Sequence, residues 1–435
     1  MTPADSYTPD SGTSELSVEH YDLTLDYRIV PNRLAGHAQL RVRLRAQTSE
    51  LALDLAGLRV TKATIDGARV RWRQHGRKLT LHARREYPRD ALLNVEIAYS
   101  GNPEPAMGMW GDVGWEELED GVLVAGQPNG AATWFPCNDH PSNKASYRIS
   151  VLVESPYTVI SNGRLVTTSR KAGRTRWVWE SKAPLAPYLA TVQIGQYERT
   201  ELAPLGRPGP VPLTVACSRS MRQKAHRALA KQHNMMQVFS DWFGPYPFDH
   251  YGVVVTDDVL EIPLESQPLS ILGPNHLEAT WEAERLVAHE LAHQWFGNSL
   301  TLGQWSDIWL NEGFACYAEW LWAEAAERGT ADELARVHWN LLDSQPQNLV
   351  LADPGPADMF DDRIYKRGAL TLHALRRRIG DESFRRLLQA WTQQYQHGHV
   401  STEDFLRLAA EITGESISPI VDPWLYEEKL PRLPH

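Results

Sequence analysis

The sequence predicts a two-domain α+β protein, with a β-sheet domain first and a mostly helical domain second. Up to about residue 200, apolar and polar side chains alternate in short segments, which is typical of half-buried strands. From about residue 221, apolar residues recur at helical spacing instead. Residues 204–210 between them read Pro-Leu-Gly-Arg-Pro-Gly-Pro, a composition typical of a linker. We therefore expect a flexible tail over residues 1–15, a β-rich domain over residues 16–203 and a second domain over residues 204–435.

The composition is that of a soluble globular protein. A chain of 435 residues suits two domains, and its hydrophobic content of 42% and charged content of 23% are ordinary. The net charge of −10 argues against nucleic acid or anionic membranes as the main partners. The polar first 25 residues and the lack of any apolar run of membrane-spanning length favour a cytoplasmic protein with no membrane partner. Three cysteines predict no disulfide framework.

In the first domain, the alternation is clearest at residues 40–45. Leucine, valine and leucine at positions 40, 42 and 44 alternate with arginines at 41, 43 and 45, which predicts a strand with one buried and one solvated face. Further strands are expected at residues 21–27, 147–153 and 174–179. Turn signals separate the strands at Pro31-Asn32, Asp66-Gly67 and Asn162-Gly163.

In the second domain, residues 221–243 predict one helix, which ends at Gly244-Pro245, and residues 251–256 predict a short strand. The next helix is expected to begin after Thr280 and to end at Gly297-Asn298. Another should run from Ser306 or Asp307 to Arg328-Gly329. Later helices are expected at residues 381–395 and from the capping residue Ser401 through residue 412.

The most informative feature of the second domain is the sequence His-Glu-Leu-Ala-His at residues 289–293. Positions four apart lie on one face of an α-helix, so His289 and His293 can bind one ion. Glu312 follows after eighteen intervening residues, and packing of its helix on the first would bring it in as the third ligand. Catalytic zinc uses three protein ligands and keeps a fourth position for water, which Glu290 can reach as a base. We therefore predict one Zn²⁺ per chain.

Two further residues share the helical side of Glu312. Cys316 is either an extra ligand or a small core residue, and the core role is favoured because three ligands and water already satisfy zinc. Glu319 is either a hydrogen-bond acceptor for a ligand histidine or an ordinary solvated carboxylate.

Several motifs together resemble the aminopeptidase N family of zinc metallopeptidases, within the gluzincins. The zinc motif continues into Trp-Leu-Asn-Glu-Gly-Phe-Ala at residues 309–315, the usual surroundings in that family. Residues 365–369, Tyr-Lys-Arg-Gly-Ala, resemble its Tyr-x-Lys-Gly element. Residues 136–139, Pro-Cys-Asn-Asp, and residues 243–248, Phe-Gly-Pro-Tyr-Pro-Phe, resemble an element of its first domain and the start of its catalytic domain. The resemblance runs from about residue 16 to Leu430.

The resemblance implies a saddle-like antiparallel β-sheet domain followed by a thermolysin-like zinc peptidase domain. It implies an enzyme that hydrolyses the N-terminal residue from peptides with a free amine. Glu290 would take a proton from the attacking water and return it to the leaving amine, and Tyr365 would stabilise the oxyanion.

The element that makes the family exopeptidases departs from the usual pattern. The family has Gly-Ala-Met-Glu-Asn before the zinc helix, whereas residues 262–266 here read Ile-Pro-Leu-Glu-Ser. The resemblance assigns Glu265 to the substrate α-ammonium, and Glu261 is a competing assignment that the order Leu-Glu-Ser disfavours. Gln127, ten residues before Cys137, stands where the family places a second residue that faces the amine.

Family members commonly continue into a small β-domain and a large helical domain that closes the site, whereas this sequence stops where the catalytic domain is expected to end. A more open cleft is expected, unless self-association with a second subunit covers it. Three other functions stay open: a zinc endopeptidase, an epoxide hydrolase as in one branch of the family, and a non-catalytic scaffold. The intact zinc motif, with Glu290 and Tyr365, argues against the scaffold.

Overall fold

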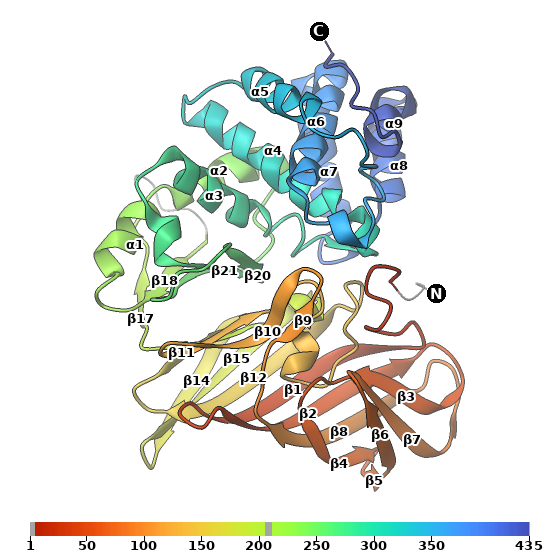
Figure 1. Cartoon of the computed structure of the whole chain (residues 1–435), viewed down its shortest axis with the longest axis vertical. Coiled ribbons are helices and arrows are strands. Elements are labelled where there is room, and N and C mark those ends of the chain that lie inside the picture. Colours follow the sequence, from red (N-terminus) through yellow and green to blue (C-terminus); the bar gives the residue numbers. More distant parts are fainter. Residues whose placement is uncertain (1–4, 205–210, 435) are drawn as a thin grey trace.

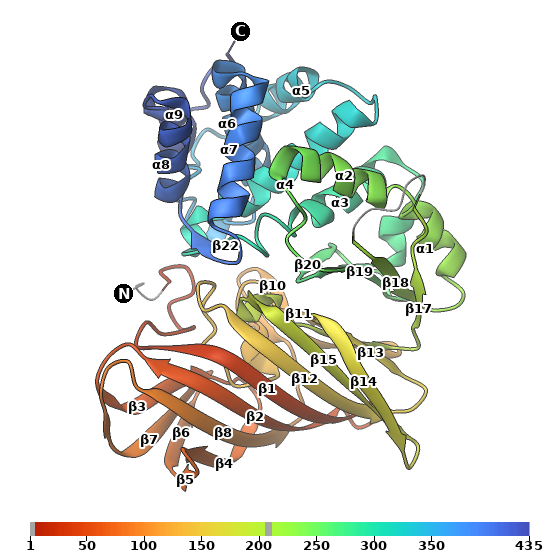
Figure 2. The same cartoon turned by 180° about the vertical axis from the view of Figure 1, so that it is seen from behind.

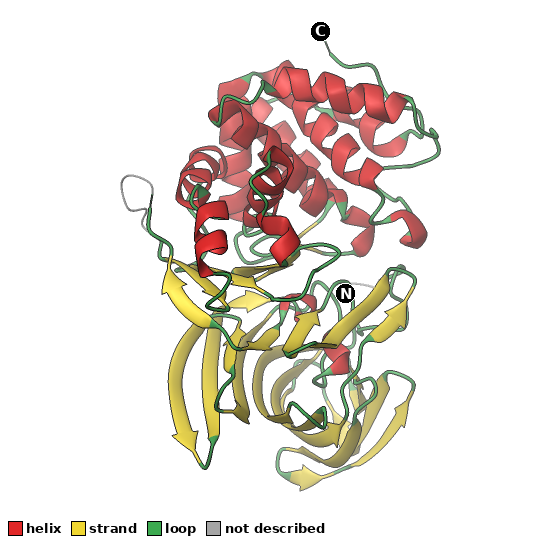
Figure 3. Ribbon diagram, turned by 60° about the vertical axis from the view of Figure 1, so that its left-hand side comes forward, coloured by secondary structure: helices red, strands yellow, loops and turns green. Residues whose placement is uncertain are grey.

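The computed structural model describes residues 5–204 and 211–434, which form a β-sheet domain below a mostly helical domain (Figure 1). Figure 3 shows this segregation of strands and helices from a second direction. The described part of the first domain comprises β1 (Leu16–Arg28), β2 (Arg33–Leu44), β3 (Thr48–Asp54), β4 (Arg59–Ile65), β5 (Ala68–Arg69), β6 (Arg71–His75), β7 (Lys78–Tyr87), β8 (Leu92–Gly101), β9 (Ala106–Gly108), β10 (Gly111–Leu118), β11 (Gly121–Ala125), η1 (Ala131–Thr133), β12 (Ala145–Glu154), β13 (Thr158–Ser161), β14 (Arg164–Lys171), β15 (Arg174–Leu185), η2 (Pro187–Leu189) and β16 (Val192–Gly195).

The largest sheet of this domain has the strand order β14-β15-β12-β1-β2-β8-β4-β5, and Figure 2 shows it as a curved layer. Every second side chain of β1 is buried between Tyr21 and Tyr27, and Leu40, Val42 and Leu44 of β2 are buried as predicted. Two smaller sheets, β13-β16-β11-β10-β9 and β3-β7-β6, complete the domain.

The large sheet departs from the antiparallel prediction at one described pair of strands. β1 pairs with β12 in parallel, from His20 opposite Ser146 to Asp26 opposite Leu152. The pairing places the ring of Tyr21 against that of Tyr147, with 4.7 Å between stacked centroids. The two strands are far apart in the sequence, so a long connection can return the chain in the same direction.

The second part of the chain begins with strands and continues mainly with helices. Its elements are β17 (Glu198–Glu201), β18 (Leu213–Cys217), α1 (Arg222–Ala228), α2 (Gln232–Phe243), β19 (Tyr251–Val255), β20 (Leu264–Ser266), β21 (Leu269–Leu272), η3 (Pro274–Leu277), α3 (Trp281–Ala292), β22 (Thr301–Leu302), η4 (Trp305–Asp307), α4 (Trp309–Ala325), α5 (Ala331–Asp343), η5 (Pro356–Asp358), α6 (Asp362–Ile379), α7 (Asp381–Gln394), β23 (His399–Val400), α8 (Thr402–Thr413) and α9 (Ser418–Tyr426). None of these helices combines the length and the apolar character needed to cross a membrane.

The sheet of the second domain has the order β17-β18-β19-β21-β20. β20 is its edge strand and lies beside α3, since Gln294, just beyond the helix, donates from Nε2 to the carbonyl of Ser266 at 3.1 Å. The hydroxyl of Ser270 in β21 also donates to the carbonyl of Glu290 in α3, at 3.4 Å. These contacts hold the strand that carries Glu265 next to the helix that carries the zinc motif.

The helix boundaries differ from the predictions in two places. The helix expected over residues 221–243 is broken into α1 and α2, because the chain turns between Leu229 and Gln232, where the amide of Gln232 donates to the carbonyl of Leu229 at 3.0 Å. α3 ends at Ala292 rather than at Gly297, because the next residues form tighter turns that include a bond from the amide of Trp295 to the carbonyl of Ala292. The caps Thr280 and Ser401 are confirmed, each accepting the amide of the third residue of its helix.

The expected flexible tail is wrong for residues 5–15, while residues 1–4 lie outside the described part. Asp5, Thr8 and Ser11 are almost fully buried. Asp5 accepts the amide of Trp305 at 2.6 Å, and Tyr7 donates to Asp353. The segment is therefore ordered by the second domain, to which the Asp5 carboxylate and the Tyr7 hydroxyl are hydrogen-bonded.

The boundary expected at residue 204 is also displaced. β17, which ends at Glu201, pairs with β18 and so belongs to the sheet of the second domain. The expected linker at residues 204–210 lies outside the described residues, except for Pro204.

Between the domains, the ammonium group of Lys144 is buried and donates to three carbonyl oxygens of the second domain. The acceptors are those of Asn298 at 2.8 Å, Ser299 at 2.7 Å and Gly398 at 3.2 Å. Burial lowers the pKa of Lys144 well below its usual value of 10.5. The hydrogen bonds satisfy its donors, so this lysine joins the first domain to the loop after α3.

Candidate active site

The helix α3 carries both histidines of the zinc motif. Thr280 caps it by accepting the amide of Ala283, and Glu282 and Glu284 occupy its first turn, where the helix dipole favours negative charge. His289 lies in the last turn, and His293 is the C-cap residue. Both residues are buried, so the helix holds two imidazole rings inside the protein, 4.8 Å apart between centroids.

Glu312 reaches the two histidines from α4. Its Oε2 atom lies 3.4 Å from Nε2 of His289 and 3.4 Å from Nε2 of His293. Two ligand atoms bound tetrahedrally to zinc at about 2.0–2.1 Å lie about 3.3–3.4 Å apart, so these spacings suit one zinc ion. Among the residues that the structure describes, these three form the group whose ligand atoms gather within 4.8 Å of one another.

The other ring nitrogen of each histidine is occupied, which leaves Nε2 for a metal. Nδ1 of His289 lies 2.7 Å from Oε1 of Glu319, and Nδ1 of His293 lies 3.0 Å from the carbonyl oxygen of Phe296. Arg285 in turn donates to Glu319 at 2.5 Å. Such outer contacts fix the orientation of ligand histidines. The structure thus places Glu319 as an acceptor for His289, the role that the sequence left undecided.

The site holds more negative than positive charge before a metal is counted. Burial alone would lower the pKa of His289, but hydrogen bonds with Glu312 and Glu319 raise it to about 10. The pKa of His293 rises to about 9, because the charges of Glu312 and Glu265 outweigh its burial. The same negative charge that stabilises protonated histidines would also stabilise a divalent cation bound between them. Donor types, spacing and charge therefore all fit zinc.

Glu290 lies between the two histidines in the sequence and is almost fully buried. Burial raises the pKa of its carboxyl group, His289 and His293 oppose this, and the balance is about 7. Within the described residues, its Oε2 atom has no hydrogen-bond partner. A buried carboxylate oxygen without a partner is costly unless a further molecule binds it, and a water molecule next to the metal site would do so.

Tyr365 comes from the first turn of α6, and its ring stacks on that of His289 with 5.9 Å between centroids. Burial raises the pKa of its hydroxyl well above 10, and the charges of Glu312 and Glu265 raise it further, so it stays a proton donor.

A close contact between helices sets the place of Tyr365. A Cβ atom added to Gly313 of α4 would lie 2.7 Å from the Cα atom of Gly368 in α6. The two glycines let the helices touch through their backbones, one residue after Glu312 and three residues after Tyr365.

Glu265 on β20 lies beside the metal-ligand group, whereas Glu261 is exposed. Burial raises the pKa of Glu265, with the charge of His293 lowering it and that of Glu312 raising it, which places the carboxylate near both. Its Oε1 atom is buried and has no hydrogen-bond partner in the described chain. The structure therefore favours Glu265 over Glu261 as a site for a cationic group.

Gln127 follows β11 of the first domain, and its Nε2 atom is buried without a partner among the described residues. The adjacent Gly126 is packed on the backbone of Tyr188, whose carbonyl oxygen would be 2.3 Å from an added Cβ atom. The Tyr188 hydroxyl donates to the carbonyl of Gly297 at 3.2 Å, and its pKa is raised by burial and then by the charges of Glu265 and Glu312. Tyr188 thus lies next to the residue before Gln127 and close enough to Glu265 to feel its charge.

Sequence reasoning missed Tyr188 and Arg285. Tyr188 reaches the site only because η2 of the first domain packs against the loop after α3, and no local pattern signals that packing. Arg285 lies four residues before His289, on the same helical side, so its spacing offered a signal for its contact with Glu319. Cys316 is buried in the core, outside the metal-ligand group of the described residues.

The chain matches two described domain families. Residues 227–424 match the Peptidase family M1 domain, and residues 17–189 match the Peptidase M1 N-terminal domain. The two matches together cover most of the chain and correspond to its two structural parts.

Among proteins of known sequence, the chain is 24% identical over 440 residues to "Leucyl aminopeptidase" of Saccharolobus solfataricus, with 96% of this chain and 54% of that protein covered. It is 24% identical over 458 residues to "Glutamyl aminopeptidase" of Sus scrofa, with 95% and 48% covered. The chain thus spans about half the length of these relatives.

Two similar solved structures match the chain over its full length. A mutant of the M1 zinc metallopeptidase from Deinococcus radiodurans, bound to a Tyr-Ser-Ala substrate, is 31% identical, with a TM-score of 0.92 and 100% of both chains covered. A mutant two-domain M1 zinc metallopeptidase bound to L-arginine is 30% identical, with a TM-score of 0.90 and the same coverage.

Proposed function

Because the chain belongs to the peptidase M1 family, we propose that it is a zinc-dependent aminopeptidase, which removes the N-terminal residue from peptides. The observation that carries the proposal is a pair of buried carboxylate oxygens, one of Glu290 and one of Glu265, which have no hydrogen-bond partner among the described residues and lie beside one metal-ligand group. One of them can serve a water molecule and the other a substrate ammonium group. The names of the relatives, which are aminopeptidases, support the same activity.

His289, His293 and Glu312 would hold the zinc ion through two Nε2 atoms and one carboxylate. Zinc bound there supplies a Lewis acid that polarises the scissile carbonyl and lowers the pKa of water. Glu290 then accepts the proton from the attacking water and delivers it to the leaving amine. Its burial keeps bulk water from competing for the carboxylate.

Tyr365 would donate its hydroxyl hydrogen to the oxygen that becomes negative in the tetrahedral state. The raised pKa of this hydroxyl keeps the hydrogen in place at neutral pH. Stacking on His289 already orients the Tyr365 ring, so its hydroxyl would not have to reorient during the reaction. A hydrogen-bond donor that is oriented in advance stabilises the transition state most effectively.

Glu265 would bind the α-ammonium group of the substrate and so fix the distance from the N-terminus to the cut bond. A buried carboxylate attracts an ammonium group strongly because little water screens the pair. Gln127 is proposed as a second contact of the amine, because its buried Nε2 atom marks unsatisfied polar space near Tyr188. Its amide oxygen is the atom that can accept from an ammonium group.

The experiment compares free and blocked substrates. We expect hydrolysis of Tyr-Ser-Ala and of amino-acid arylamides, and at least a hundredfold lower kcat/KM for their N-acetylated forms, because acetylation removes the positive charge that Glu265 binds. Equal turnover of free and blocked forms would show an endopeptidase instead. Self-association over the cleft stays a prediction, which sedimentation velocity can test.

The same assay separates Glu265 from its neighbour. Glu265→Gln should lower kcat/KM for free-amine substrates by about 10–150-fold, which corresponds to the loss of a hydrogen bond to a charged group of about 1.5–3 kcal/mol. The matched control is Glu261→Gln, which removes the same charge from the exposed part of the same segment and should leave kcat/KM unchanged. An unchanged preference for the free amine in Glu265→Gln would assign amine binding to another residue.

A further inference from the structure

A pocket of 280 Å³ lies at the junction of the two domains, and none of the residues of the candidate active site lines it. Its walls come from five parts of the chain: the segment before and at the start of β1, Arg45 just after β2, Arg89 between β7 and β8, the segment between η1 and β12, and His399 in β23 of the second domain. The pocket therefore joins parts of the chain that are far apart in sequence.

The lining of this pocket is positively charged. Arg45 and Arg89 both line it, and none of the described aspartates or glutamates does. In the described chain, the side chain of Arg45 has no ion pair, and Arg89 has one at 3.8 Å to Asp90, where both side chains are about two-thirds exposed. An exposed pair at that distance contributes little, so both guanidinium groups are free to bind an anion.

A second, independent observation points to a ligand with acceptor atoms. Ser17 lines the pocket, and its hydroxyl oxygen is buried and makes no hydrogen bond with any described residue. A buried hydroxyl without a partner costs free energy, which an acceptor in the pocket would recover. Ser14 adds a further hydroxyl to the same wall.

The part of the pocket wall that Asn138 and Asn143 form is already rigid. Asn138 accepts the amide of Thr13 at 2.7 Å and donates to the carbonyl of Leu16 at 3.0 Å and to Asn143 at 2.8 Å. Asn143 in turn bonds both backbone groups of Val18.

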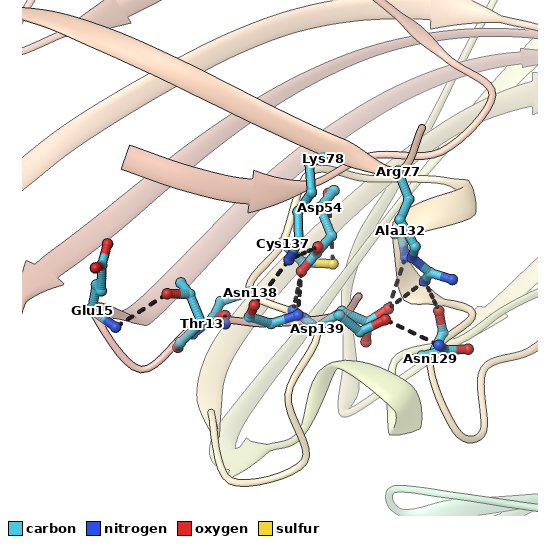
Figure 4. A network of polar contacts seen from close by, with 12 residues as sticks. Thr13, Glu15, Asp54, Arg77, Lys78, Asn129, Ala132, Cys137, Asn138 and Asp139 are labelled. Atoms are coloured by element: carbon cyan, nitrogen blue, oxygen red, sulfur yellow. Dashed lines mark hydrogen bonds and ion pairs between the residues drawn. The ribbon is translucent and has the colours of Figure 1, made fainter. Parts of the chain in front are cut away.

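Behind this wall, Asp54 accepts the amides of Gly12 and Asp139, and Lys78 donates to Asp54 at 2.6 Å (Figure 4). A wall held by so many bonds needs little rearrangement to receive a ligand.

We propose that this pocket is a binding site for a phosphate group, carried either by inorganic phosphate or by a small phosphate monoester. Guanidinium groups match the geometry of phosphate oxygens and can bind them with paired hydrogen bonds. The Ser17 hydroxyl donates to a third oxygen. The pocket is larger than one phosphate ion, so it also has room for the organic part of a monoester.

A phosphate in this place would strengthen the contact between the domains. His399 belongs to β23, which pairs in parallel with β22, four residues after the loop at Gly297 that follows the zinc helix. A ligand that binds the folded protein raises its stability in proportion to the logarithm of its concentration. At ten times its Kd, it should raise Tm by about 1–2 °C.

The test measures binding of inorganic phosphate and of ribose 5-phosphate to the whole protein, by isothermal titration calorimetry and by thermal denaturation at constant ionic strength. Saturable binding of either compound with a rise in Tm supports the site, and the tighter of the two identifies the source of the phosphate. No saturable binding of either compound at 20 mM would overturn the proposal.

Variants then locate the binding. Arg45→Gln/Arg89→Gln should weaken phosphate binding at least tenfold and abolish the rise in Tm. The matched control, Arg59→Gln/Arg73→Gln, removes the same charge from exposed positions of the same domain outside the pocket. If both double variants lose phosphate binding equally, the attraction is non-specific. If neither loses it, phosphate binds elsewhere. Either result would overturn the site. Far-ultraviolet circular dichroism verifies that both variants are folded.

Discussion

At the scale of single residues, four carboxylates with different tasks surround two histidines. Glu312 faces both Nε2 atoms, Glu319 holds the far side of His289, and Glu290 and Glu265 each present an oxygen without a partner in the described chain. These differences come from position alone, since all four are glutamates. Each can therefore be tested by the same change, glutamate to glutamine, with a different readout.

Glu290→Gln should remove activity and leave zinc bound. Glutamine keeps the shape of the side chain but cannot accept the proton, so we expect kcat to fall by about 10²–10⁴-fold. Zinc content, measured by atomic absorption, should stay at one ion per chain because Glu290 is outside the ligand group. Residual activity near that of the wild type would contradict its role as the base.

Glu319→Gln should lower the affinity for zinc rather than remove the catalytic base. Loss of the carboxylate weakens the hydrogen bond to Nδ1 of His289, so zinc affinity should fall about 10–100-fold, measured by competition with a chelator. Glu282→Gln, in the exposed first turn of α3, is the matched control and should leave the affinity unchanged. If the two variants retain equal affinity, Glu319 serves only to pair with Arg285.

The sequence predicts those residues of the site whose positions follow from their spacing along the chain. His289, Glu290 and His293 are assigned by their spacing on one helix, and Glu312 by its distance along the chain. Tyr188 is not predictable in this way, because its contact with the loop at Gly297 exists only after two domains pack together. The role of Gln127 as a second contact of the substrate amine stays a prediction, because Gln127 also lies in the first domain and can reach the site only through domain packing.

At the scale of elements, the crossing of α4 and α6 aligns the parts of the site. Gly313 and Gly368 allow backbone contact, so Glu312 and Tyr365 approach the same point from two helices. The C-terminal part of the chain fixes α6 in turn. Arg367 donates to the carbonyls of Trp424 at 2.8 Å, Leu349 at 3.0 Å and Glu428 at 2.9 Å.

Gly313→Ala should disturb this crossing. The new methyl group would meet Gly368 at 2.7 Å, so the helices must separate, which costs about 1–3 kcal/mol of stability. We expect a lower Tm and, if Tyr365 has the oxyanion role proposed above, at least a tenfold lower kcat, because its hydroxyl would move away from the reacting carbonyl. Gly252→Ala is the control, since its methyl group would have no atom closer than 3.5 Å. Wild-type kcat in Gly313→Ala would separate the helix contact from catalysis.

Element types were predicted better than element ends. The capped helices after Thr280 and Ser401 were correct because their caps are local signals. The break between α1 and α2 was missed, since the apolar pattern of residues 221–243 continues across it. The parallel pairing of β1 with β12 was also missed, because strand order depends on contacts distant in sequence.

At the scale of the whole molecule, the segment at residues 5–15 is held by buried charge. Asp54 and Asp139 lie close together in the first domain, where Asp54 bonds to the amide of Gly12. Burial raises the pKa of Asp139 from 3.8 to about 7, which Arg77 opposes and Asp54 reinforces. The folded protein therefore binds a proton at Asp139 under conditions where the unfolded chain has released it.

This proton makes stability depend on pH. Because the folded-state pKa of Asp139 is raised, the folded state binds more protons between about pH 4 and 7, and the free energy of unfolding falls as pH rises through that window. Asp139→Asn should flatten this part of the profile by at least about 1.4 kcal/mol, the equivalent of one pKa unit. Urea denaturation from pH 5 to 8 measures the difference.

The control for this prediction is Asp10→Asn, which changes an exposed carboxylate of the same segment and should keep the wild-type profile. Profiles of the same slope for wild type and Asp139→Asn would contradict the raised pKa.

The ordered segment at residues 5–15 has a mechanical consequence. The chain connects the two halves once after β16, and this segment makes a second connection, from Asp5 at Trp305 to Gly12 at Asp54. It adds to the bonds that Lys144 and Tyr188 of the first domain make to the loop after α3. Any rotation of one half against the other must therefore break buried hydrogen bonds at several separate places, which makes the two halves a stiff unit.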